Sequence, residues 1–268
     1  MKFCGEEIRD WVYENYRAAY CLGTGVLTLA AWALCPEKYR KASLFWGAYS
    51  TILTVGALLE PCVNVTSSLY GEVLSCGNNC GNKIALTFDD GPHPINTPLI
   101  LDVLAREKVK ASFFCVGKNV IEFPNLIEKM KADGHLIGSH SFSHCNFLGC
   151  TPGRARQEIL KGGLALEAVL GEKIRYYRPP YGMRYPWNLK DGSRLRQLAV
   201  LWSNCPRDWQ LPGAAVIAQR VVSRAKPGDI VLLHDGGGDR EQTAQALPLI
   251  IEGLRQRGFE FVRVDELF

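Results

Sequence analysis

Short apolar runs alternate with amphipathic stretches from Lys83 to the end of the chain. Six runs predict strands, over residues 84–88, 111–116, 136–139, 198–202, 230–233 and 259–262. Five longer stretches have the apolar spacing of helices, over residues 97–107, 124–133, 154–170, 214–225 and 243–257. Continuous apolar strands flanked by amphipathic helices are typical of a parallel sheet covered on its outer faces. The pattern therefore predicts an α/β fold whose chemistry collects at the C-terminal ends of the strands.

The N-terminal part of the chain has a different pattern. No charged residue occurs from Ala18 to Pro36 or from Ala42 to Leu59, and each stretch is near the lower length limit for a membrane-crossing helix. The turn at 36–41 between them carries three cationic side chains. We expect a membrane hairpin through residues 18–59, with this basic turn in the cytoplasm and the rest of the chain outside. The alternative is a packed helical pair in a secreted or soluble protein.

These changes of pattern divide the chain into three parts. Residues 1–60 form the hydrophobic helical segment, and residues 61–82, rich in Pro, Asn, Ser and Gly, read as a linker. Residues 83–268 form the predicted α/β domain.

Composition removes some classes of function. The chain has 268 residues, 47% of them hydrophobic, with a net charge of +4. Such a mild and evenly spread charge does not favour nucleic-acid binding. The ten cysteines include no CxxC pair, which excludes a zinc ribbon. Cys76 with Cys80, and Cys145 with Cys150, flank short turns, so each pair forms a local bridge or contributes small buried side chains.

Two predicted strands end in residues that bind metals. Asp89 and Asp90 follow the run 84–88; alone they are an ordinary Asp-Gly turn, but with a cation both carboxylates stay ionised. His140 and His144 follow the run 136–139 and share one face if that segment is helical. Packed or solvated histidines are the alternative. Two histidines and one carboxylate leave open positions for water and substrate, as a catalytic metal site requires.

Other polar residues follow later strands. The prolines of Arg178-Pro179-Pro180-Tyr181-Gly182 form a rigid loop that either has no further role or aims an arginine and a backbone N–H into the site. Trp202 ends a run, and Asp208-Trp209 follows; a tryptophan here either lines a sugar pocket or fills the core. His234 ends the run 230–233 and is a candidate general acid.

In this order the motifs resemble those of the polysaccharide deacetylases of carbohydrate esterase family 4, over roughly residues 83–268. The matching motifs are Thr87-Phe88-Asp89-Asp90-Gly91-Pro92, His140-Ser141-Phe142-Ser143-His144, Arg178-Pro179-Pro180-Tyr181-Gly182, Asp208-Trp209 and Leu232-Leu233-His234. The resemblance implies a distorted (β/α) barrel with fewer than eight complete units. It also implies hydrolysis of N-acetyl groups on amino sugars of a cell-wall or chitin-like polysaccharide.

The resemblance further implies a role for each matched residue. Asp90, His140 and His144 would bind a divalent metal, usually zinc, with cobalt or nickel as alternatives.

Asp89 would be the general base, paired with Arg178, and His234 the general acid. The backbone N–H of Tyr181 would stabilise the oxyanion. Substrate would contact the remaining matched residues, Trp209, Leu232, Pro179 and Asp208.

One departure from the family pattern concerns the general acid. Many relatives have an aspartate three positions before Asp208 that hydrogen-bonds the catalytic histidine, and this chain has Cys205 there. Asp208 or Asp235 would have to replace it. Two alternatives to a polymer deacetylase stay open: a deacylase of lipid-linked sugars, which a membrane hairpin would suit, and a weakly active glycan-binding relative, which Cys205 alone suggests.

Overall fold

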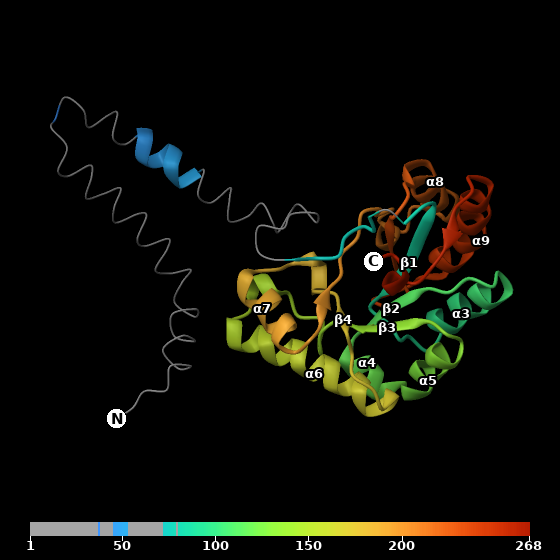
Figure 1. The fold of residues 1–268 in the computed structure, drawn as a ribbon, viewed down its shortest axis with the longest axis horizontal. Helices are drawn as coiled ribbons and strands as arrows, with labels where there is room; N and C mark the ends of the chain where they lie inside the picture. The colour runs from blue at the N-terminus through green and yellow to red at the C-terminus, as the bar shows by residue number, and fades with distance from the viewer. Residues whose placement is uncertain (1–36, 38–44, 53–71, 79) are drawn as a thin grey trace.

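The structure is a computed structural model that describes residues 37, 45–52, 72–78 and 80–268 (Figure 1). Residues 18–36 and most of 42–59, on which the predicted membrane hairpin depends, lie outside the described residues. Within the described ranges, no helix has the length and apolar character needed to cross a bilayer.

Strands and helices alternate along the described chain from residue 83, as the hydrophobic pattern predicted. Strands β1 to β7 span Lys83–Asp89, Ser112–Cys115, Leu136–Ser139, Tyr176–Tyr177, Leu198–Ala199, Ile230–His234 and Glu260–Phe261. Helices α3 to α9 span Asn96–Arg106, Gly117–Glu122, Pro124–Ala132, Pro152–Leu170, Pro186–Arg194, Ala214–Arg224 and Glu241–Gln256. Short 3₁₀ turns η2 to η5 cover Phe147–Gly149, Pro180–Gly182, Asp208–Gln210 and Val264–Glu266.

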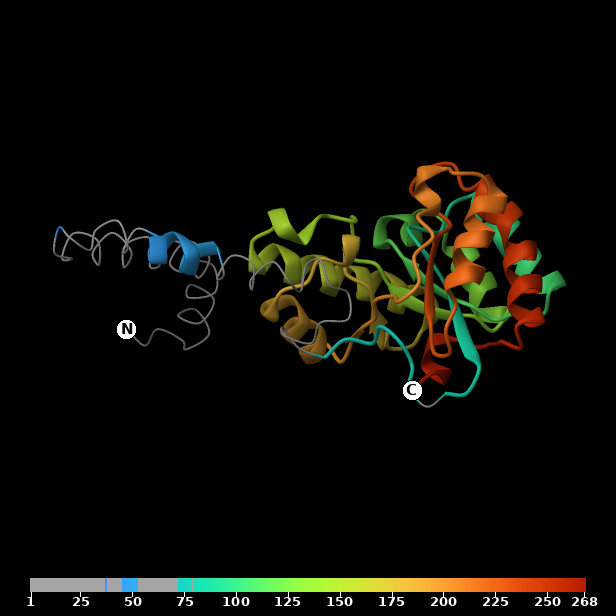
Figure 2. The same ribbon diagram turned by 90° about the horizontal axis from the view of Figure 1, so that it is seen from above.

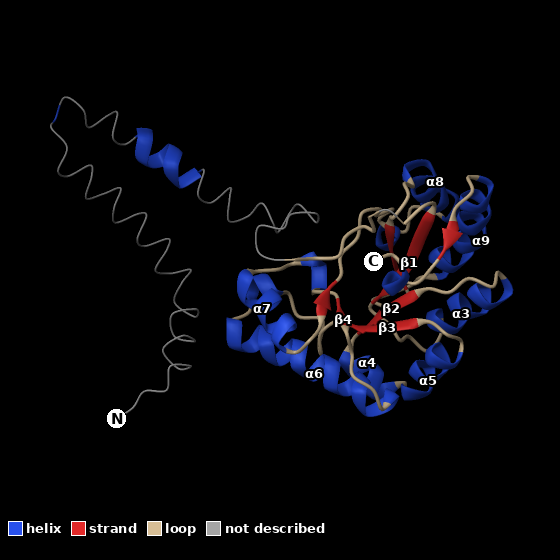
Figure 3. Ribbon diagram, in the orientation of Figure 1, coloured by secondary structure: helices blue, strands red, loops and turns tan. Residues whose placement is uncertain are grey.

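All seven strands pair in parallel, in the order β5-β4-β3-β2-β1-β6, with β7 beside the start of β1. The segment after β5 joins the two edges of this sheet, because Asn204 pairs in parallel with Val231 of β6. The predicted parallel sheet with surrounding helices is confirmed, and helices cover its outside (Figure 2; Figure 3). The paired edges make it a distorted barrel.

Alternation along the strands separates barrel interior from helix-facing exterior, since successive side chains of a strand point to opposite faces. In β1, the residues Ile84, Leu86 and Phe88 belong to the large core beneath the helices. Ala85 belongs to the second cluster, with Phe114, Val200 and Ile230, inside the barrel. Asp89 is four residues after Ala85, so its side chain also points inward, at the C-terminal end of the barrel.

Helix α6 shows how local sequence sets an element boundary. The Thr151 hydroxyl accepts a hydrogen bond from the backbone N–H of Arg154, and Pro152 occupies the first helical turn. Gly171 ends the helix in the left-handed conformation, at φ 69°. The helix therefore begins at Pro152, two residues before the start predicted from apolar spacing.

The predicted linker extends too far toward the C-terminus. The backbone of Leu74 bonds to Ala199 and Leu201, and Gly77 N–H donates to the carbonyl of Gly228. Leu74 packs against the core inside the barrel. Residues 74–77 therefore belong to the folded domain. The apolar side chain of Leu74 is accommodated in the core, and the backbone pairs with a strand edge that would otherwise lack a partner, although the composition of this segment is typical of a loop.

Candidate metal centre and active site

Asp90, His140 and His144 come together at the C-terminal end of the barrel, as their sequence pattern predicted. Their ligand atoms all lie within 4.8 Å of one another. Nε2 of His144 is 3.1 Å from Oδ1 of Asp90, and Nε2 of His140 is 3.4 Å from the same oxygen. Among the described residues, this is the group of histidine, cysteine and acidic side chains that has the arrangement of a metal site.

The local backbone differs from the expectation for the two histidines. Residues 140–144 are not helical, so the condition for a shared helix face is not met. Ser141 and His144 have left-handed φ values of 65° and 57°, and Asp90 has φ 73°. Such values are uncommon for residues with a Cβ and concentrate at functional sites. Two sharp turns, one after β1 and one after β3, bring the three ligands together instead.

The three residues fit a divalent cation. Nδ1–H of His140 donates to the carbonyl of Arg178 at 2.8 Å, which fixes the tautomer and leaves the Nε2 lone pair toward Asp90. Oδ1 of Asp90 is buried and, while Nε2 of His140 and of His144 carries no proton, it has no hydrogen-bond donor among the described residues. Two acceptors facing each other at 3.4 Å require a cation or a proton between them. One oxygen and two imidazole nitrogens are ligands that zinc prefers.

The charges at this site shift the pKa values of its members. Burial opposes the charged form of Asp90, but hydrogen bonds and charge from His140 and His144 hold its pKa well below the usual range. Burial also disfavours charged His140, yet the carboxylates of Asp89 and Asp90 raise its pKa above the ordinary value. A proton therefore competes with a metal for this site.

Asp89 lies beside the metal residues and is held by an arginine. Its Oδ1 accepts from Nη1 of Arg178 at 2.7 Å, and both side chains are almost completely buried. Its Oδ2 is 3.7 Å from Nε2 of His140. Register places Asp89 of β1 directly beside His234 of β6, so both side chains occupy the same face of neighbouring strands. One carboxylate thus sits between the metal ligands and the candidate acid.

The Arg178 guanidinium is fixed by the barrel wall. Besides Asp89, it donates to the hydroxyl of Thr87 and to the carbonyls of Val200 and Leu201. Its guanidinium carbon lies 4.1 Å from the centre of the Phe114 ring. Burying a charge is costly unless it is paired, and here the donors point at fixed acceptors. Arg178 therefore holds the Asp89 carboxylate in one orientation.

His234 is supported by Asp208. Its Nδ1–H donates to Oδ1 of Asp208 at 2.8 Å, and its backbone N–H donates to Oδ2 at 2.9 Å. The Thr243 hydroxyl also donates to Oδ2. Burial lowers the pKa of His234, but the hydrogen bond and charge of Asp208 outweigh it and raise the pKa above the ordinary value. Asp208 therefore takes the place that Cys205 leaves open.

Asp208 and Pro179 do not line the cavity that the site faces, although both were expected to contact substrate. Asp208 is fully buried behind His234, and Pro179 is buried before the turn η3. The cavity has a volume of about 530 Å³ and is lined by the metal residues with Asp89, His234, Tyr181, Trp202, Trp209, Leu232, Gly237 and Arg240. Trp202, for which core and pocket were both open, is part of this lining.

Two exposed aromatic rings flank the centre. Tyr181 has φ 58° in the turn η3, and its ring centre is 4.8 Å from that of His144. Trp209 lies on the other side, with its ring centre 5.2 Å from that of His234. Both rings are more than 40% exposed at the cavity mouth. Flat apolar surfaces of this kind suit the apolar faces of sugar rings.

Sequence reasoning missed the loop that supports Asp90 from behind. A Cβ on Gly236 would lie 2.1 Å from the carbonyl oxygen of Asp90, and a Cβ on Gly237 would lie 2.5 Å from its Oδ2. Arg240 ties this loop together by donating to the carbonyls of Gly236, Gly237 and Asp239. The three consecutive glycines directly after His234-Asp235 were the sequence signal that could have identified it.

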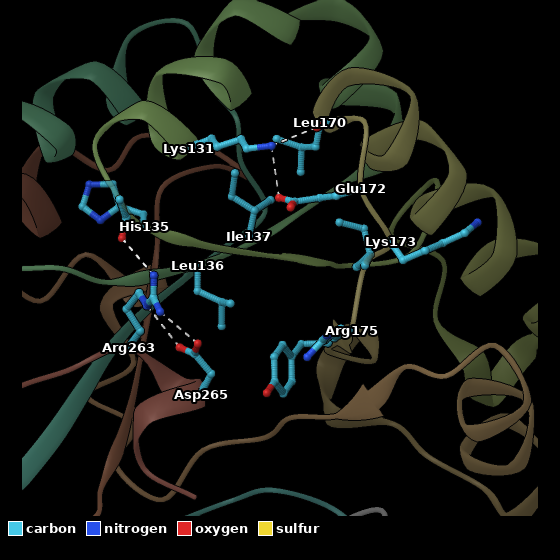
Figure 4. Close-up of a pocket in the computed structure, with 13 residues that line it drawn as sticks. Lys131, His135, Leu136, Ile137, Leu170, Glu172, Lys173, Arg175, Arg263 and Asp265 are labelled. Atoms are coloured by element: carbon cyan, nitrogen blue, oxygen red, sulfur yellow. Dashed lines mark hydrogen bonds and ion pairs between the residues drawn. The ribbon is translucent and has the colours of Figure 1, made fainter.

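A second cavity, of about 440 Å³, lies at the opposite end of the strands, beside the first residues of β3 and β4 (Figure 4). Two of its cationic side chains contact acids: Lys131 is 3.3 Å from Glu172, and Arg263 is 3.0 Å from Asp265. None of the predicted catalytic residues lines this cavity. The predicted chemistry therefore gathers at one end of the barrel.

The sequence of the chain is similar to those of polysaccharide deacetylases. Residues 77–196 match the sequence family described as Polysaccharide deacetylase. The chain is 41% identical over 186 residues to a peptidoglycan-N-acetylglucosamine deacetylase of Bacillus cereus, covering 69% of this chain and 87% of that protein. It is 37% identical over 210 residues to a chitooligosaccharide deacetylase of a Bradyrhizobium species, covering 74% and 94%.

Solved structures give the same picture. A peptidoglycan N-acetylglucosamine deacetylase in complex with 4-naphthalen-1-yl-N-oxidanyl-benzamide superposes with a TM-score of 0.70 at 34% identity, covering 72% of this chain and 91% of that one. A family 4 carbohydrate esterase pseudoenzyme from Bacillus anthracis is also similar, with a TM-score of 0.67 at 27% identity, covering 72% and 67%. The fold thus occurs in both active and inactive proteins.

Proposed function

The chain belongs to the polysaccharide deacetylase family, and from this we propose that it hydrolyses N-acetyl groups on amino-sugar residues of peptidoglycan or a chitin-like polysaccharide. One observation carries the proposal: Asp89, the group of Asp90, His140 and His144, and His234 all face one cavity. A pseudoenzyme is expected to have lost one of these groups, and this chain retains them all. Polymers of N-acetylated sugars are also the substrates in the names of the relatives.

We propose zinc as the metal, held by Asp90, His140 and His144. When bound, such a cation would polarise an acyl carbonyl and lower the pKa of a water molecule toward 7. Cobalt and nickel use the same ligand types and are alternatives.

Asp89 acts as the general base. Its carboxylate lies beside the metal residues, with Oδ1 fixed by Arg178 and Oδ2 toward His140. The free oxygen accepts a proton from water as that water attacks the amide carbonyl. Arg178 keeps this oxygen aimed at the cavity.

His234 acts as the general acid. An amine leaves poorly as an anion, so it needs a proton as the C–N bond breaks. Asp208 keeps Nδ1 protonated and stabilises the imidazolium, so Nε2 carries the proton that the leaving nitrogen receives.

The turn η3 and the aromatic side chains position the substrate. The backbone N–H of Tyr181 donates to the oxyanion that develops from the acyl oxygen, an interaction worth about 3–4 kcal/mol in the transition state. Trp209 and Leu232 line the pocket for the acetyl methyl group, and Trp202 closes its wall.

The test is acetate release from N-acetyl-chitooligosaccharides and peptidoglycan fragments, with wild type and Asp89→Asn, with and without added zinc. Wild type should release acetate only when zinc is present. Asn keeps the shape of Asp89 but not its basicity, so we expect the rate to fall by about 10²–10⁴-fold. Zinc content of the variant, measured by atomic emission, should equal that of wild type.

The remaining candidates are outcomes of the same test. Zinc-loaded wild type that releases no acetate from either polymer, but does so from a lipid-linked amino sugar, would reassign the substrate. Glycan binding without release from any substrate would indicate an inactive relative.

We propose that the catalytic domain acts outside the cytoplasm, since peptidoglycan in the name of a relative is a cell-wall polymer. Protease added to intact cells should then degrade residues 83–268, while a cytoplasmic marker protein survives. Protection of the domain until the cells are lysed would contradict this location. The finer proposal of a membrane anchor in residues 18–59 predicts that the full chain sediments with membranes.

A further inference from the structure

Two cysteine side chains meet at the ends of the loop that follows metal residue His144. Sγ of Cys145 lies 3.1 Å from Sγ of Cys150. Both side chains are half-buried. They pack at the edge of a cluster that contains the buried ring of Phe147. The two sulfurs need to approach by about 1 Å to reach bonding distance.

The loop has defined structure and connects the metal centre to helix α6. Its 3₁₀ turn η2 is closed by a hydrogen bond from Cys150 N–H to the carbonyl of Phe147. His144 comes immediately before Cys145, and Thr151, the N-cap of α6, comes immediately after Cys150. A bond between the sulfurs would close a six-residue ring with the metal ligand at one end and a long helix at the other. Such a ring fixes the backbone from which His144 reaches Asp90.

We propose that Cys145 and Cys150 are a redox site whose disulfide fixes the loop behind metal ligand His144. The part of this proposal that concerns metal binding rests on the proposed function. The disulfide itself does not, because it depends only on the geometry of the two thiols.

A low-molecular-weight disulfide, such as glutathione disulfide, is the oxidant by chemical class. One cysteine loses its proton, attacks this disulfide and releases one molecule of thiol, which leaves a mixed disulfide on the protein. The second cysteine loses its proton, attacks the protein sulfur of the mixed disulfide and releases a second thiol. The two protein thiols have then lost two protons and two electrons, and the oxidant has gained them. A dithiol reductant reverses the sequence.

Trypsin isolates the pair, because cleavage after Lys131 and Arg154 releases residues 132–154 with Cys145 and Cys150 as the sole cysteines. The full-length protein is incubated with glutathione disulfide, denatured in iodoacetamide, digested and measured by mass spectrometry. We expect residues 132–154 to carry no carbamidomethyl group and to be lighter than the reduced peptide by two hydrogen atoms. Peptide 111–118, with the buried Cys115, is the matched control and should be fully alkylated.

Two carbamidomethyl groups on residues 132–154 after this treatment would overturn the proposal. A glutathione adduct that persists on either cysteine would overturn it as well, because it would show that the second thiol cannot reach the first.

Zinc affinity tests the consequence for His144. Competition with a chromophoric chelator should show that oxidised protein binds zinc about tenfold more tightly than reduced protein, the lower end of the effect of groups that hold metal ligands in place. The double variant Cys145→Ser with Cys150→Ser should match reduced protein and no longer respond to glutathione disulfide. Equal affinity of oxidised and reduced wild type, with the disulfide present, would overturn the coupling. A second zinc equivalent in reduced wild type, lost in the double variant, would show a thiol metal site instead.

Discussion

At the scale of single residues, the site separates the roles of groups that lie close together by shifting their pKa values in opposite directions. The carboxyl of Asp90 is held ionised by two histidines, whereas His234 is held protonated by Asp208. An ionised carboxylate suits a metal ligand, and a protonated imidazole suits a general acid. Burial raises the pKa of Asp235, and the negative charges of Asp90 and Asp89 raise it further.

Asp208→Asn tests the support of the general acid. Loss of the carboxylate removes the charge that stabilises the His234 imidazolium, so the pKa of His234 falls. As the pH is raised, His234 should then lose its proton earlier than in wild type. The alkaline limb of the pH–rate profile should therefore move to lower pH. We expect a rate loss of about 10²-fold or more near neutral pH, measured as acetate release between pH 5 and 9.

The control for this experiment is Asp102→Asn, which removes an exposed carboxylate on α3. Its pH–rate profile should overlay that of wild type. An alkaline limb that stays in place in Asp208→Asn would show that His234 is not the group that titrates.

Asp235→Asn should change the pH dependence of folding stability. Burial raises the pKa of Asp235 to about 7, and one of its oxygens has no hydrogen-bond partner. A folded pKa above the unfolded value means that its stabilising contribution is full below about pH 4 and is lost as pH rises through 7. The variant is neutral at all pH values, and its amide can keep the hydrogen bond from Thr97. The melting temperature of the variant minus that of wild type should therefore increase from pH 5 to pH 8. A difference that stays constant over this range would contradict the raised pKa of Asp235.

At the scale of elements, the loop after β6 supports the loop after β1. Gly237 has φ 69° and approaches the Asp90 carboxylate so closely that a methyl group would collide with it. Asn119 of α4 donates to the Asp90 carbonyl from another direction. The metal ligand is therefore positioned by contacts from two elements distant in the sequence.

Gly237→Ala should weaken metal binding through this contact. The added Cβ pushes against Oδ2 of Asp90 and displaces the ligand, so we expect zinc affinity to fall by about 10–100-fold, as for other groups that orient metal ligands. Competition with a chromophoric chelator measures the loss.

Gly171→Ala is the matched control. Gly171 has the same φ of 69°, at the end of α6, but a Cβ there meets nothing within 4 Å. This variant should lose about 1 kcal/mol of folding stability from backbone strain and keep the zinc affinity of wild type. Equal zinc affinity in the two alanine variants would show that the contact with Asp90 has no effect on the metal site.

At the scale of the whole molecule, the metal site joins two parts of the barrel, since Asp90 follows β1 and both histidines follow β3. Binding to the folded state alone should stabilise the entire domain. Zinc at 100 times its dissociation constant adds about 2.7 kcal/mol to the free energy of unfolding. For a domain of this size we expect the melting temperature to rise by about 5–10 °C over protein treated with a chelator.

This increase should shrink as the pH falls from 8 to 6. The raised pKa of His140 means that protons compete with the metal in this range, and each ligand must be deprotonated to bind. Differential scanning calorimetry at each pH, at fixed zinc concentration, measures the increase. His144→Ala should abolish the increase at every pH, and an unchanged increase in that variant would contradict the assignment of His144 as a ligand.

The sequence by itself determined the repeating elements and the place of the chemistry. Hydrophobic periodicity is a local property, so most strands and helices appear within a few residues of their predicted bounds. Because parallel strands end at the same edge, residues that follow strands, such as Asp90, His140 and His234, were predicted to converge although they are far apart in the chain.

Only the tertiary structure decided which side chains contact one another within that convergence. Asp208 against His234, Gly237 against Asp90, and the closure of the barrel through Asn204 are contacts between distant segments. No local pattern specifies them, because they depend on strand register and on backbone turns such as those at Ser141 and His144. The sequence therefore determined the residue types and their order, and packing determined their partners and their pKa values.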